Sequence, residues 1–353
     1  MVENNNSFFR NNIDQMSGYM PGEQPERIGG WIKLNTNENP YPPSPKVKEV
    51  LNNFSYENLR LYPNPIADEL RSIIAEIHNL KPDNVIAGNG SDDILTIAIR
   101  CFVGEGEFVA CPEPSYSLYP VLTQIQAGKC LKIQLNDDFS LPQNFNQSAA
   151  PAKLILIPRP NAPTGNAFNL DDMHKLCSEF DGIVLIDEAY ADFADDNCID
   201  FVSQYSNVIV SRTLSKSYSL AGIRFGFALA SQNLINGMMK VKDSYNVNML
   251  TQKIAAAALN DQKYFLDTLN KIKATRKDFT LKLLSAGFDV PLSKANFVFT
   301  SPPKGNADEL YSYLKNNGVL VRYFPGALTR NYVRITIGTE HEMKILFDLI
   351  NEF

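Results

Sequence analysis

The chain has 353 residues, of which 44% are hydrophobic and 20% charged, as in most globular proteins. Its net charge of −6 argues against a nucleic-acid-binding protein, and no apolar run approaches the roughly 18 residues that span a bilayer. Five cysteines without a C-x-x-C pair and only three histidines argue against a zinc site. The polar N-terminus lacks the pattern of a secretion signal, so we expect a cytoplasmic protein without bound metal.

In chain order, a polar arm to about residue 30 precedes a short extended piece at 31–35. A proline-rich stretch at 39–45 then delays regular structure until a helix can start. Beyond it, short apolar runs alternate with helical periodicity. We expect strands at 85–87, 108–111, 153–157, 182–186, 208–210 and 225–229, and helices at 66–79, 92–102 and 170–179. This alternation predicts an α/β fold, with a mostly parallel sheet covered by helices on both faces.

After about residue 244 the pattern changes. A long helical region at 249–286 leads to further elements, which are strands at 296–300, 319–323 and 332–336 and helices at 308–316 and from 341 to the end. These predict a smaller α+β domain with its own sheet. We therefore expect an N-terminal arm at 1–40 that packs with the small domain or a dimer partner, a large domain at 41–245 and a small domain at 246–353.

Ligands of an open α/β sheet bind beyond the carboxyl ends of its strands. The strand at 182–186 ends at Asp187, and the next one leads to Lys216, which lies among small and apolar residues. A lysine near a desolvated pocket has a lowered pKa and is nucleophilic, as Schiff-base chemistry requires. An acidic partner for a pyridinium nitrogen is the other half of a pyridoxal-phosphate site.

An anion cradle is the second feature of these strand ends. The strand at 85–87 leads to Gly88-Asn-Gly-Ser-Asp92 at the start of a helix, whose free N–H groups favour a phosphate. Such a turn is more often plain helix capping. Ser215 and Arg224 follow the other strand and can reach the same phosphate, so the cofactor interpretation depends on the whole set.

The set resembles the fold-type-I aminotransferases, which use pyridoxal phosphate, and within them the histidinol-phosphate aminotransferases. The similarity runs from about Tyr19 to Phe353. The matching segments, in order, are 18–22, 33–41, 60–65, 90–92, 114–116, 160–165, 187–190, 213–224, 245–248, 296–298, 320–322 and 332–336.

The resemblance implies roles for individual residues. Lys216 would form the Schiff base with the cofactor and move the proton, Asp187 would pair with the pyridine nitrogen, and Tyr190 would bond the phenolic oxygen. Tyr116 would stack on the ring. The phosphate would lie among Gly90, Ser91, Asp92, Thr213, Ser215 and Arg224.

The resemblance also implies a homodimer with shared active sites, in which Tyr62 reaches the cofactor of the neighbouring subunit. Arg334 would bind the substrate α-carboxylate, as bidentate arginine pairing allows. Histidinol phosphate has no such carboxylate, so Arg334, Arg322 and Tyr19 would instead meet its phosphate. Asn37 completes the expected substrate-binding set.

One position departs from the family. Many relatives have asparagine directly before Pro-Thr-Gly, where it bonds the cofactor's ring oxygen, whereas this chain has Ala162 there and Asn161 one residue earlier. Either Asn161 replaces that contact or Tyr190 carries it alone. The Ala162–Pro163 bond is also expected to be cis, as X-Pro bonds allow in tight turns.

We therefore expect a ping-pong aminotransferase that interconverts histidinol phosphate and 2-oxoglutarate with imidazole acetol phosphate and glutamate. An aromatic or other amino-acid aminotransferase is the nearest alternative, and a threonine-phosphate decarboxylase shares most motifs. A catalytically silent regulator with this fold is a further alternative. It predicts an attached DNA-binding module, which the sequence does not suggest, and the intact Lys216 and Asp187 favour an enzyme.

Overall fold

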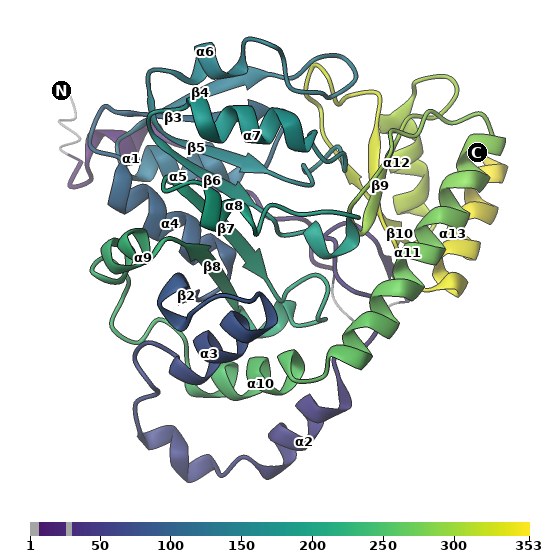
Figure 1. The fold of residues 1–353 in the computed structure, drawn as a ribbon. Helices are drawn as coiled ribbons and strands as arrows, with labels where there is room; N and C mark the ends of the chain where they lie inside the picture. Colours follow the sequence, from purple (N-terminus) through teal and green to yellow (C-terminus); the bar gives the residue numbers. More distant parts are fainter. Residues whose placement is uncertain (1–6, 26–29) are drawn as a thin grey trace, which may run out of the picture.

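The computed structural model describes residues 7–25 and 30–353 (Figure 1). Its main sheet has seven strands in the order β2-β8-β7-β6-β5-β3-β4. The strands are β2 (Val85–Gly88), β3 (Phe108–Glu113), β4 (Lys129–Gln134), β5 (Ala152–Pro158), β6 (Ile183–Asp187), β7 (Val208–Thr213) and β8 (Gly226–Ala230). Of these, β8 alone runs antiparallel to its neighbours, so the other six end at the same edge of the sheet.

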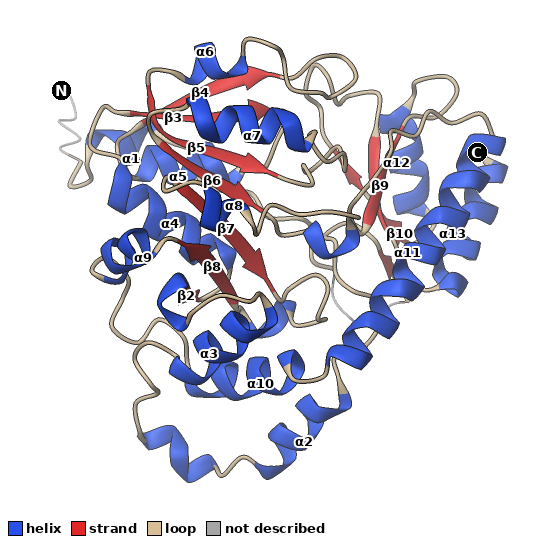
Figure 2. Cartoon of the chain, in the orientation of Figure 1, coloured by secondary structure: helices blue, strands red, loops and turns tan. Residues whose placement is uncertain are grey.

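Helices cover both faces of this sheet (Figure 2). On β5, Leu154 and Leu156 face one apolar core while Ile155 and Ile157 face the other. The first core includes α4 (Ser91–Phe102), α5 (Leu118–Ile125) and α9 (Gln232–Met239). The second includes α2 (Pro45–Asn53), α3 (Asp68–Ile77), α6 (Phe145–Ala149), α7 (Leu170–Glu179), α8 (Phe201–Gln204) and α10 (Met249–Leu259). The predicted α/β fold is confirmed, because strands apolar on both faces must be buried on both.

A smaller body at the right of Figure 1 has its own core. Its antiparallel sheet has the order β11-β12-β9, and a separate parallel pair joins β1 to β10. The strands are β1 (Ile32–Lys33), β9 (Phe297–Thr300), β10 (Val319–Leu320), β11 (Arg322–Tyr323) and β12 (Val333–Thr336). The helices are α11 (Gln262–Ser285), α12 (Ala307–Asn316) and α13 (Glu340–Glu352). Single 3₁₀ turns connect other elements at η1 (Tyr56–Arg60), η2 (Pro82–Asn84), η3 (Ala191–Phe193) and η4 (Ala221–Ile223).

Helix starts follow local capping chemistry. Ser44 accepts a hydrogen bond from Lys46 N ahead of α2, whose first residue is proline, a residue favoured at that position. Thr339 and Glu342 form a capping box at the start of α13. The long helical region expected at 249–286 consists of two helices, because the chain turns at Asn260–Asp261 and Asp261 caps the new helix α11.

The same turn bears on the expected boundary between the large and the small domain. Helix α10 packs against α2 and α3 and belongs to the core of the main sheet, whereas α11 belongs to the small body. We therefore propose a boundary near residue 260 in place of 245. The expected strand at 319–323 is likewise divided, with β10 paired to β1 and β11 paired to β12.

The predicted arm, residues 1–40, includes 1–6 and 26–29, which lie outside the described residues. Its helix α1 (Asn11–Gln15) contacts α5, where Arg10 and Asn12 donate to the carbonyl groups of Ile125 and Gln124. Further along, Leu34 is buried in the small body's core. The described part of the arm thus contacts both bodies.

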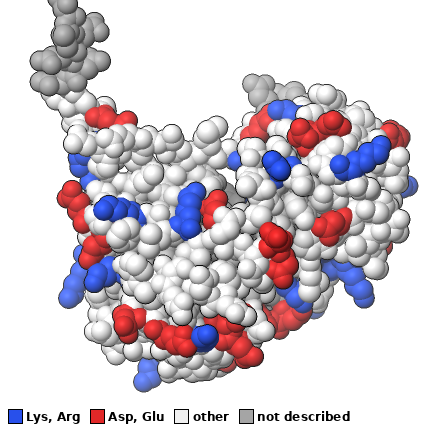
Figure 3. Space-filling model, turned by 90° about the horizontal axis from the view of Figure 1, so that it is seen from above, with Lys and Arg blue, Asp and Glu red and all other residues white. Residues whose placement is uncertain are grey.

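Charged side chains of both signs are interspersed over the face shown in Figure 3. Among the described residues, no helix combines the length and apolar character that crossing a membrane requires.

Candidate active site

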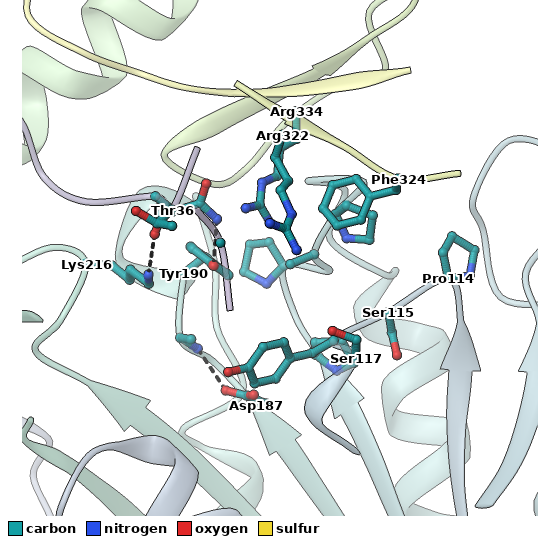
Figure 4. Close-up of a pocket in the computed structure, with 18 of the residues that line it drawn as sticks. Thr36, Pro114, Ser115, Ser117, Asp187, Tyr190, Lys216, Arg322, Phe324 and Arg334 are labelled. Atoms are coloured by element: carbon teal, nitrogen blue, oxygen red, sulfur yellow. Dashed lines mark hydrogen bonds between the residues drawn. The ribbon is translucent and has the colours of Figure 1, made fainter. Parts of the chain in front are cut away.

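A cavity of about 390 Å³ lies at the carboxyl edge of the main sheet, in the size range of small-molecule sites. The main sheet forms one side, while Arg322, Phe324 and Arg334 project from the small sheet on the other (Figure 4). Of the residues predicted from the sequence, those that line the cavity are Tyr19, Asn37, Ser91, Asp92, Tyr116, Asp187, Tyr190, Thr213, Ser215, Lys216, Arg224, Arg322 and Arg334. Sequence segments more than 300 residues apart thus converge here.

Lys216 lies just beyond β7, and its Nζ donates a hydrogen bond to the carbonyl oxygen of Thr36 at 3.0 Å (Figure 4). Burial and, after it, the nearby positive charge of Arg334 lower the pKa of Lys216 to about 8. The unprotonated amine, which is the nucleophilic form, is therefore far more abundant near neutral pH than for an ordinary lysine.

Asp187 is the last residue of β6 and is only 4% exposed. Its Oδ1 accepts hydrogen bonds from Ala189 N at 3.2 Å and from the Ser211 hydroxyl at 3.3 Å. Its Oδ2 accepts one from the Tyr119 hydroxyl at 2.8 Å. Burial raises the pKa of Asp187 to about 6, and the bond from Tyr119 opposes this increase. The carboxylate is placed to stabilise a cation in the cavity.

Tyr190 and Asn37 form a connected pair. The Asn37 amide donates to the Tyr190 hydroxyl at 2.8 Å, so the hydroxyl keeps its own proton for another acceptor. Asn37 has a left-handed backbone, with φ of 58°, and is held through its N–H and Oδ1 by the Thr336 hydroxyl and through its carbonyl by Asn296. Burial raises the pKa of Tyr190, so the phenol stays protonated at neutral pH.

The predicted anion cradle is assembled from three segments. Ser91 begins α4, the Thr213 hydroxyl donates to Ser215 Oγ at 2.9 Å, and Arg224 Nη1 lies 3.5 Å from the same Oγ. Arg224 also pairs with Asp92 at 3.0 Å. A helix N-terminus, two hydroxyls and a guanidinium are donors suited to a phosphate group.

Glycines keep this cradle open. A Cβ on Gly90, whose φ is +87°, would lie 2.7 Å from Arg224 Nη2. A Cβ on Gly226 would lie 2.5 Å from Ser91 N, at the start of α4. Gly90 therefore shapes the cradle without lining the cavity, because its backbone alone lets the arginine approach.

The two arginines are direct neighbours across the small sheet, where Arg322 is paired with Arg334 in register. Their guanidinium carbons lie 5.7 and 5.3 Å from the ring centre of Phe324. Arg334 Nη2 donates to the carbonyl oxygen of Asn35, while its buried Nε has no partner. Because buried polar groups are normally hydrogen-bonded, this donor is suited to an anionic ligand.

The two tyrosines expected at the cofactor and substrate form an aromatic contact. The rings of Tyr19 and Tyr116 meet edge to face with centroids 6.0 Å apart, and the Tyr116 hydroxyl donates to Asp92. Tyr62 is different, since it is 79% exposed and stacks on Tyr245 outside the cavity of its own chain.

Asn161 does not reach the cavity. Its amide donates to Pro114 O at 3.1 Å and Thr164 Oγ1 at 2.7 Å, and its Oδ1 is buried without a partner. Ala162 lines the cavity at this turn, and the Ala162–Pro163 bond is cis as expected. The prediction that Asn161 replaces the family asparagine is therefore not supported, because its amide bonds Thr164 within the turn and Pro114 after β3.

Sequence reasoning missed three contributors. Thr36 supplies the carbonyl that holds Lys216, Phe324 supports both arginines, and Tyr119 binds Asp187. Position gave a weak signal in two cases, because Thr36 precedes Asn37 directly and Tyr119 follows Tyr116 by one helical turn.

The residues present fit pyridoxal phosphate. A lysine of lowered pKa, a buried carboxylate, a phenol with a free proton and a cradle of phosphate donors line one cavity of suitable volume. Each matches one part of that cofactor, respectively its aldehyde, ring nitrogen, phenolic oxygen and phosphate.

Comparisons with known proteins agree with this geometry. The model of the aminotransferase class I and II family matches residues 29–350. A histidinol-phosphate aminotransferase of Microcystis aeruginosa is 46% identical over 97% of both chains, and a histidinol-phosphate aminotransferase 1 of Trichormus variabilis is 44% identical over 96% of this chain and 97% of its own.

A solved structure has the same fold. It is a histidinol-phosphate aminotransferase of Sinorhizobium meliloti in complex with pyridoxal-5'-phosphate, with a TM-score of 0.88 over 98% of both chains and 21% identity. The fold, the site and the extent of the family match together lead to one conclusion: the chain belongs to the class I and II aminotransferases.

Proposed function

We propose that this chain is a pyridoxal-phosphate-dependent aminotransferase that converts imidazole acetol phosphate and glutamate to histidinol phosphate and 2-oxoglutarate, and catalyses the reverse reaction. The observation that carries the substrate assignment is the 46% identity to a histidinol-phosphate aminotransferase over nearly the whole length of both chains. The paired arginines of the small sheet support it, because the substrates carry a phosphate or two carboxylates.

Pyridoxal phosphate, when bound, supplies an electron sink for charge that develops at the substrate Cα. Three residues would act around it. Lys216 would hold the cofactor covalently and then carry the proton to and from the substrate Cα. Asp187 would keep a proton on the ring nitrogen, and Tyr190 would donate its free proton to the phenolic oxygen. With Ala162 in the cavity wall, Tyr190 would make that contact without help from an asparagine.

Binding of the cofactor would use the strand-end residues. Ser91, Thr213, Ser215 and Arg224 would hold its phosphate, with Asp92 fixing the Arg224 side chain through their ion pair. Gly90 would let the backbone approach, and Tyr116 would cover the ring face. This arrangement would orient the cofactor before substrate arrives.

Substrate recognition would fall to the small sheet and the arm. Arg334 would bind the α-carboxylate of glutamate through its unpartnered Nε and a second N–H group. Arg322 and Tyr19 would join it in binding the phosphate of histidinol phosphate. Asn37, expected from the sequence as a substrate contact, would act chiefly by orienting Tyr190, to which its amide is already bonded.

We also propose a homodimer in which Tyr62 completes the partner's active site. An exposed surface supports this, since Tyr62 belongs to a projecting segment whose other exposed apolar side chains are Tyr56, Leu59 and Leu61. Mixing Tyr62→Ala and Lys216→Ala subunits would test it, because a mixed dimer contains one site with both residues intact. Activity above the sum of the two parents is expected, and activity equal to that sum would contradict shared sites.

The cytoplasm is the proposed location. All five cysteines are free thiols, including Cys111 and Cys130, whose Sγ atoms lie only 3.5 Å apart. Two thiols at this short distance from each other stay reduced in a reducing compartment.

The substrate assignment is tested by a panel of amines in a 2-oxoglutarate-dependent assay that measures glutamate. We expect histidinol phosphate to give the highest kcat/KM, above phenylalanine and tyrosine, and threonine phosphate to release no carbon dioxide. Highest turnover with an aromatic amino acid would contradict the assignment in favour of an aromatic aminotransferase, and carbon dioxide from threonine phosphate in favour of a decarboxylase.

A further inference from the structure

Tyr119 makes a direct bond to the carboxylate proposed to face the cofactor nitrogen. It lies in α5, is fully buried and donates from its hydroxyl to Asp187 Oδ2 at 2.8 Å. The other carboxylate oxygen is bonded by Ser211 and Ala189. Asp187 is thus held at both oxygens, and Tyr119 makes the shortest of the three contacts.

The Tyr119 ring is itself fixed. It meets the Tyr116 ring edge to face at 5.5 Å and packs in the core between the main sheet and α4 and α5. Its carbonyl accepts the Thr123 hydroxyl at 2.8 Å. A buried phenol needs one hydrogen-bond partner, and Asp187 is the acceptor that the described residues provide. The hydroxyl is therefore aimed at one carboxylate oxygen.

The hydrogen bond from Tyr119 affects the charge state of Asp187. Burial favours protonated Asp187, and Asp92 from α4 adds repulsion, while the Tyr119 hydroxyl favours the ionised form. The other ionisable groups near Asp187 are Tyr116, before α5, and Tyr190, after β6, both neutral at physiological pH because burial raises their pKa. The bonds from Tyr119, Ala189 and Ser211 all oppose protonation of Asp187, and the bond from Tyr119 opposes it most.

We propose that Tyr119 is a positioning residue that keeps Asp187 ionised and oriented, so that the carboxylate can hold a proton on the cofactor's ring nitrogen. This inference rests on the proposed function, since it assumes that pyridoxal phosphate occupies the cavity. Tyr119 itself does not line the cavity, so its effect passes through Asp187.

Tyr119→Phe removes the hydroxyl and keeps the ring. A hydrogen bond to a charged group is strong enough that its loss should raise the pKa of Asp187 by about one to two units. In the full-length apoprotein, a ¹³C-aspartate NMR titration measures this shift directly. In the holoprotein, ¹⁵N-labelled pyridoxal phosphate should show a less protonated ring nitrogen at pH 7 than in the wild type.

Tyr332→Phe is the matched control. Tyr332 also donates to an aspartate at 2.8 Å, but that aspartate is Asp289, outside the cavity, and the bond is exposed. We expect the control to leave both the Asp187 pKa and the ¹⁵N shift unchanged. Equal Asp187 pKa values and equal ¹⁵N shifts in wild type and Tyr119→Phe would overturn the proposal, as would the same changes in both variants.

A second variant covers the case in which Tyr119→Phe does not fold. With 3-fluorotyrosine in place of Tyr119 the side-chain shape is nearly unchanged, but the more acidic phenol donates more strongly. The pKa of Asp187 should then fall, and no change would contradict the proposal. The wild-type arm separates the two hypotheses: failure of wild-type protein to bind labelled pyridoxal phosphate sinks the proposed function, whereas binding with an unresponsive Asp187 sinks only the role of Tyr119.

Discussion

The two sides of the cavity differ in how their polar groups are satisfied. On the main-sheet side, the two oxygens of Asp187, the Tyr190 hydroxyl and the Lys216 amine all have partners within the chain. On the small-sheet side, neither Arg322 nor Arg334 forms a salt bridge with any described residue, and Arg334 Nε has no partner. The difference indicates that the reacting groups are preorganised, while the arginines are left open for an anion that arrives with the substrate.

The sides are nevertheless electrostatically connected. After burial, the charge of Arg334 is the largest cause of the lowered pKa of Lys216. An anion bound by Arg334 would neutralise part of that effect, so substrate binding would raise the basicity of Lys216 when it has to accept a proton. A substitution on one side of the cavity, measured by its effect on the other side, tests this connection.

The largest effect on activity is expected from a substitution on the main-sheet side of the cavity, which carries the reacting groups. Lys216→Ala removes both the cofactor attachment and the proton carrier, so kcat should fall by at least about 10³-fold. The glutamate-forming assay measures this loss. Lys263→Ala, on exposed α11, is the control and should retain wild-type activity. Residual activity of Lys216→Ala within tenfold of the wild type would contradict the assignment of the reacting side.

On the recognition side, single-arginine variants should separate the two substrates. Arg334→Ala should lower kcat/KM for glutamate by about 10- to 100-fold, because it removes charge-assisted hydrogen bonds. Arg322→Ala should raise KM for histidinol phosphate more than for glutamate. Steady-state kinetics with each amine measures both. If Arg322→Ala affects the two amines equally, the proposed phosphate contact is wrong.

A smaller effect should appear in the pH dependence of cofactor capture. Since the folded-state pKa of Lys216 is depressed to about 8, the amine is unprotonated above that value, and the rate of pyridoxal-phosphate capture by apoprotein should rise with pH and level off above about 8. Stability changes in the same direction but in a higher window: the unfolded chain binds the lysine proton more tightly, so stability should rise with pH between about 8 and the ordinary value of 10.5.

Arg334→Gln removes the neighbouring cation, so the midpoint of that pH profile should move upward by less than about one unit. Arg322→Gln is the matched control, since Arg322 is not among the charges that act strongly on Lys216. Stopped-flow absorbance provides the rates. An unshifted midpoint in Arg334→Gln would show that the two sides are not coupled.

The smallest effect on function is expected at the irregular turn. Asn161→Ala should reduce the free energy of unfolding by about 1–3 kcal/mol, because a buried acceptor and a part-buried acceptor lose their donor. Urea unfolding measures this, with Asn146→Ala as the control, because the bond from Asn146 to Glu179 is exposed. The visible spectrum of the bound cofactor should stay unchanged in Asn161→Ala. A shifted spectrum would show that Asn161 does contact the cofactor, as the sequence suggested.

The site residues that could be predicted from the sequence pattern follow the ends of parallel strands. Asp187 and Lys216 follow short apolar runs, and parallel strands bring such ends to one edge, so their convergence was predictable. The roles of Arg322 and Arg334 were instead implied by the resemblance to the aminotransferases, and both residues lie within strands of the small sheet. Strand β4 was missed because its residues are half exposed at the sheet edge and lack a continuous apolar run.

Long-range contacts account for the rest. The Thr36 carbonyl and Lys216 are 180 residues apart, and a backbone carbonyl carries no sequence signal for such a bond. Tyr119 reads from sequence as an ordinary core tyrosine, since only the packing of α5 on the sheet reveals Asp187 as its partner. The turn at residue 260 was missed although it carried a local signal, since aspartate, here Asp261, is favoured at a helix start.

The most direct test of the account is the chemical identification of the cofactor-bearing residue. Wild-type protein loaded with pyridoxal phosphate is reduced with borohydride, digested and analysed by mass spectrometry. We predict one phosphopyridoxyl group, on the peptide that contains Lys216. In the presence of a saturating amine substrate, that peptide should carry no phosphopyridoxyl group. Label on a different lysine, or no label on protein that turns over substrate, would contradict it.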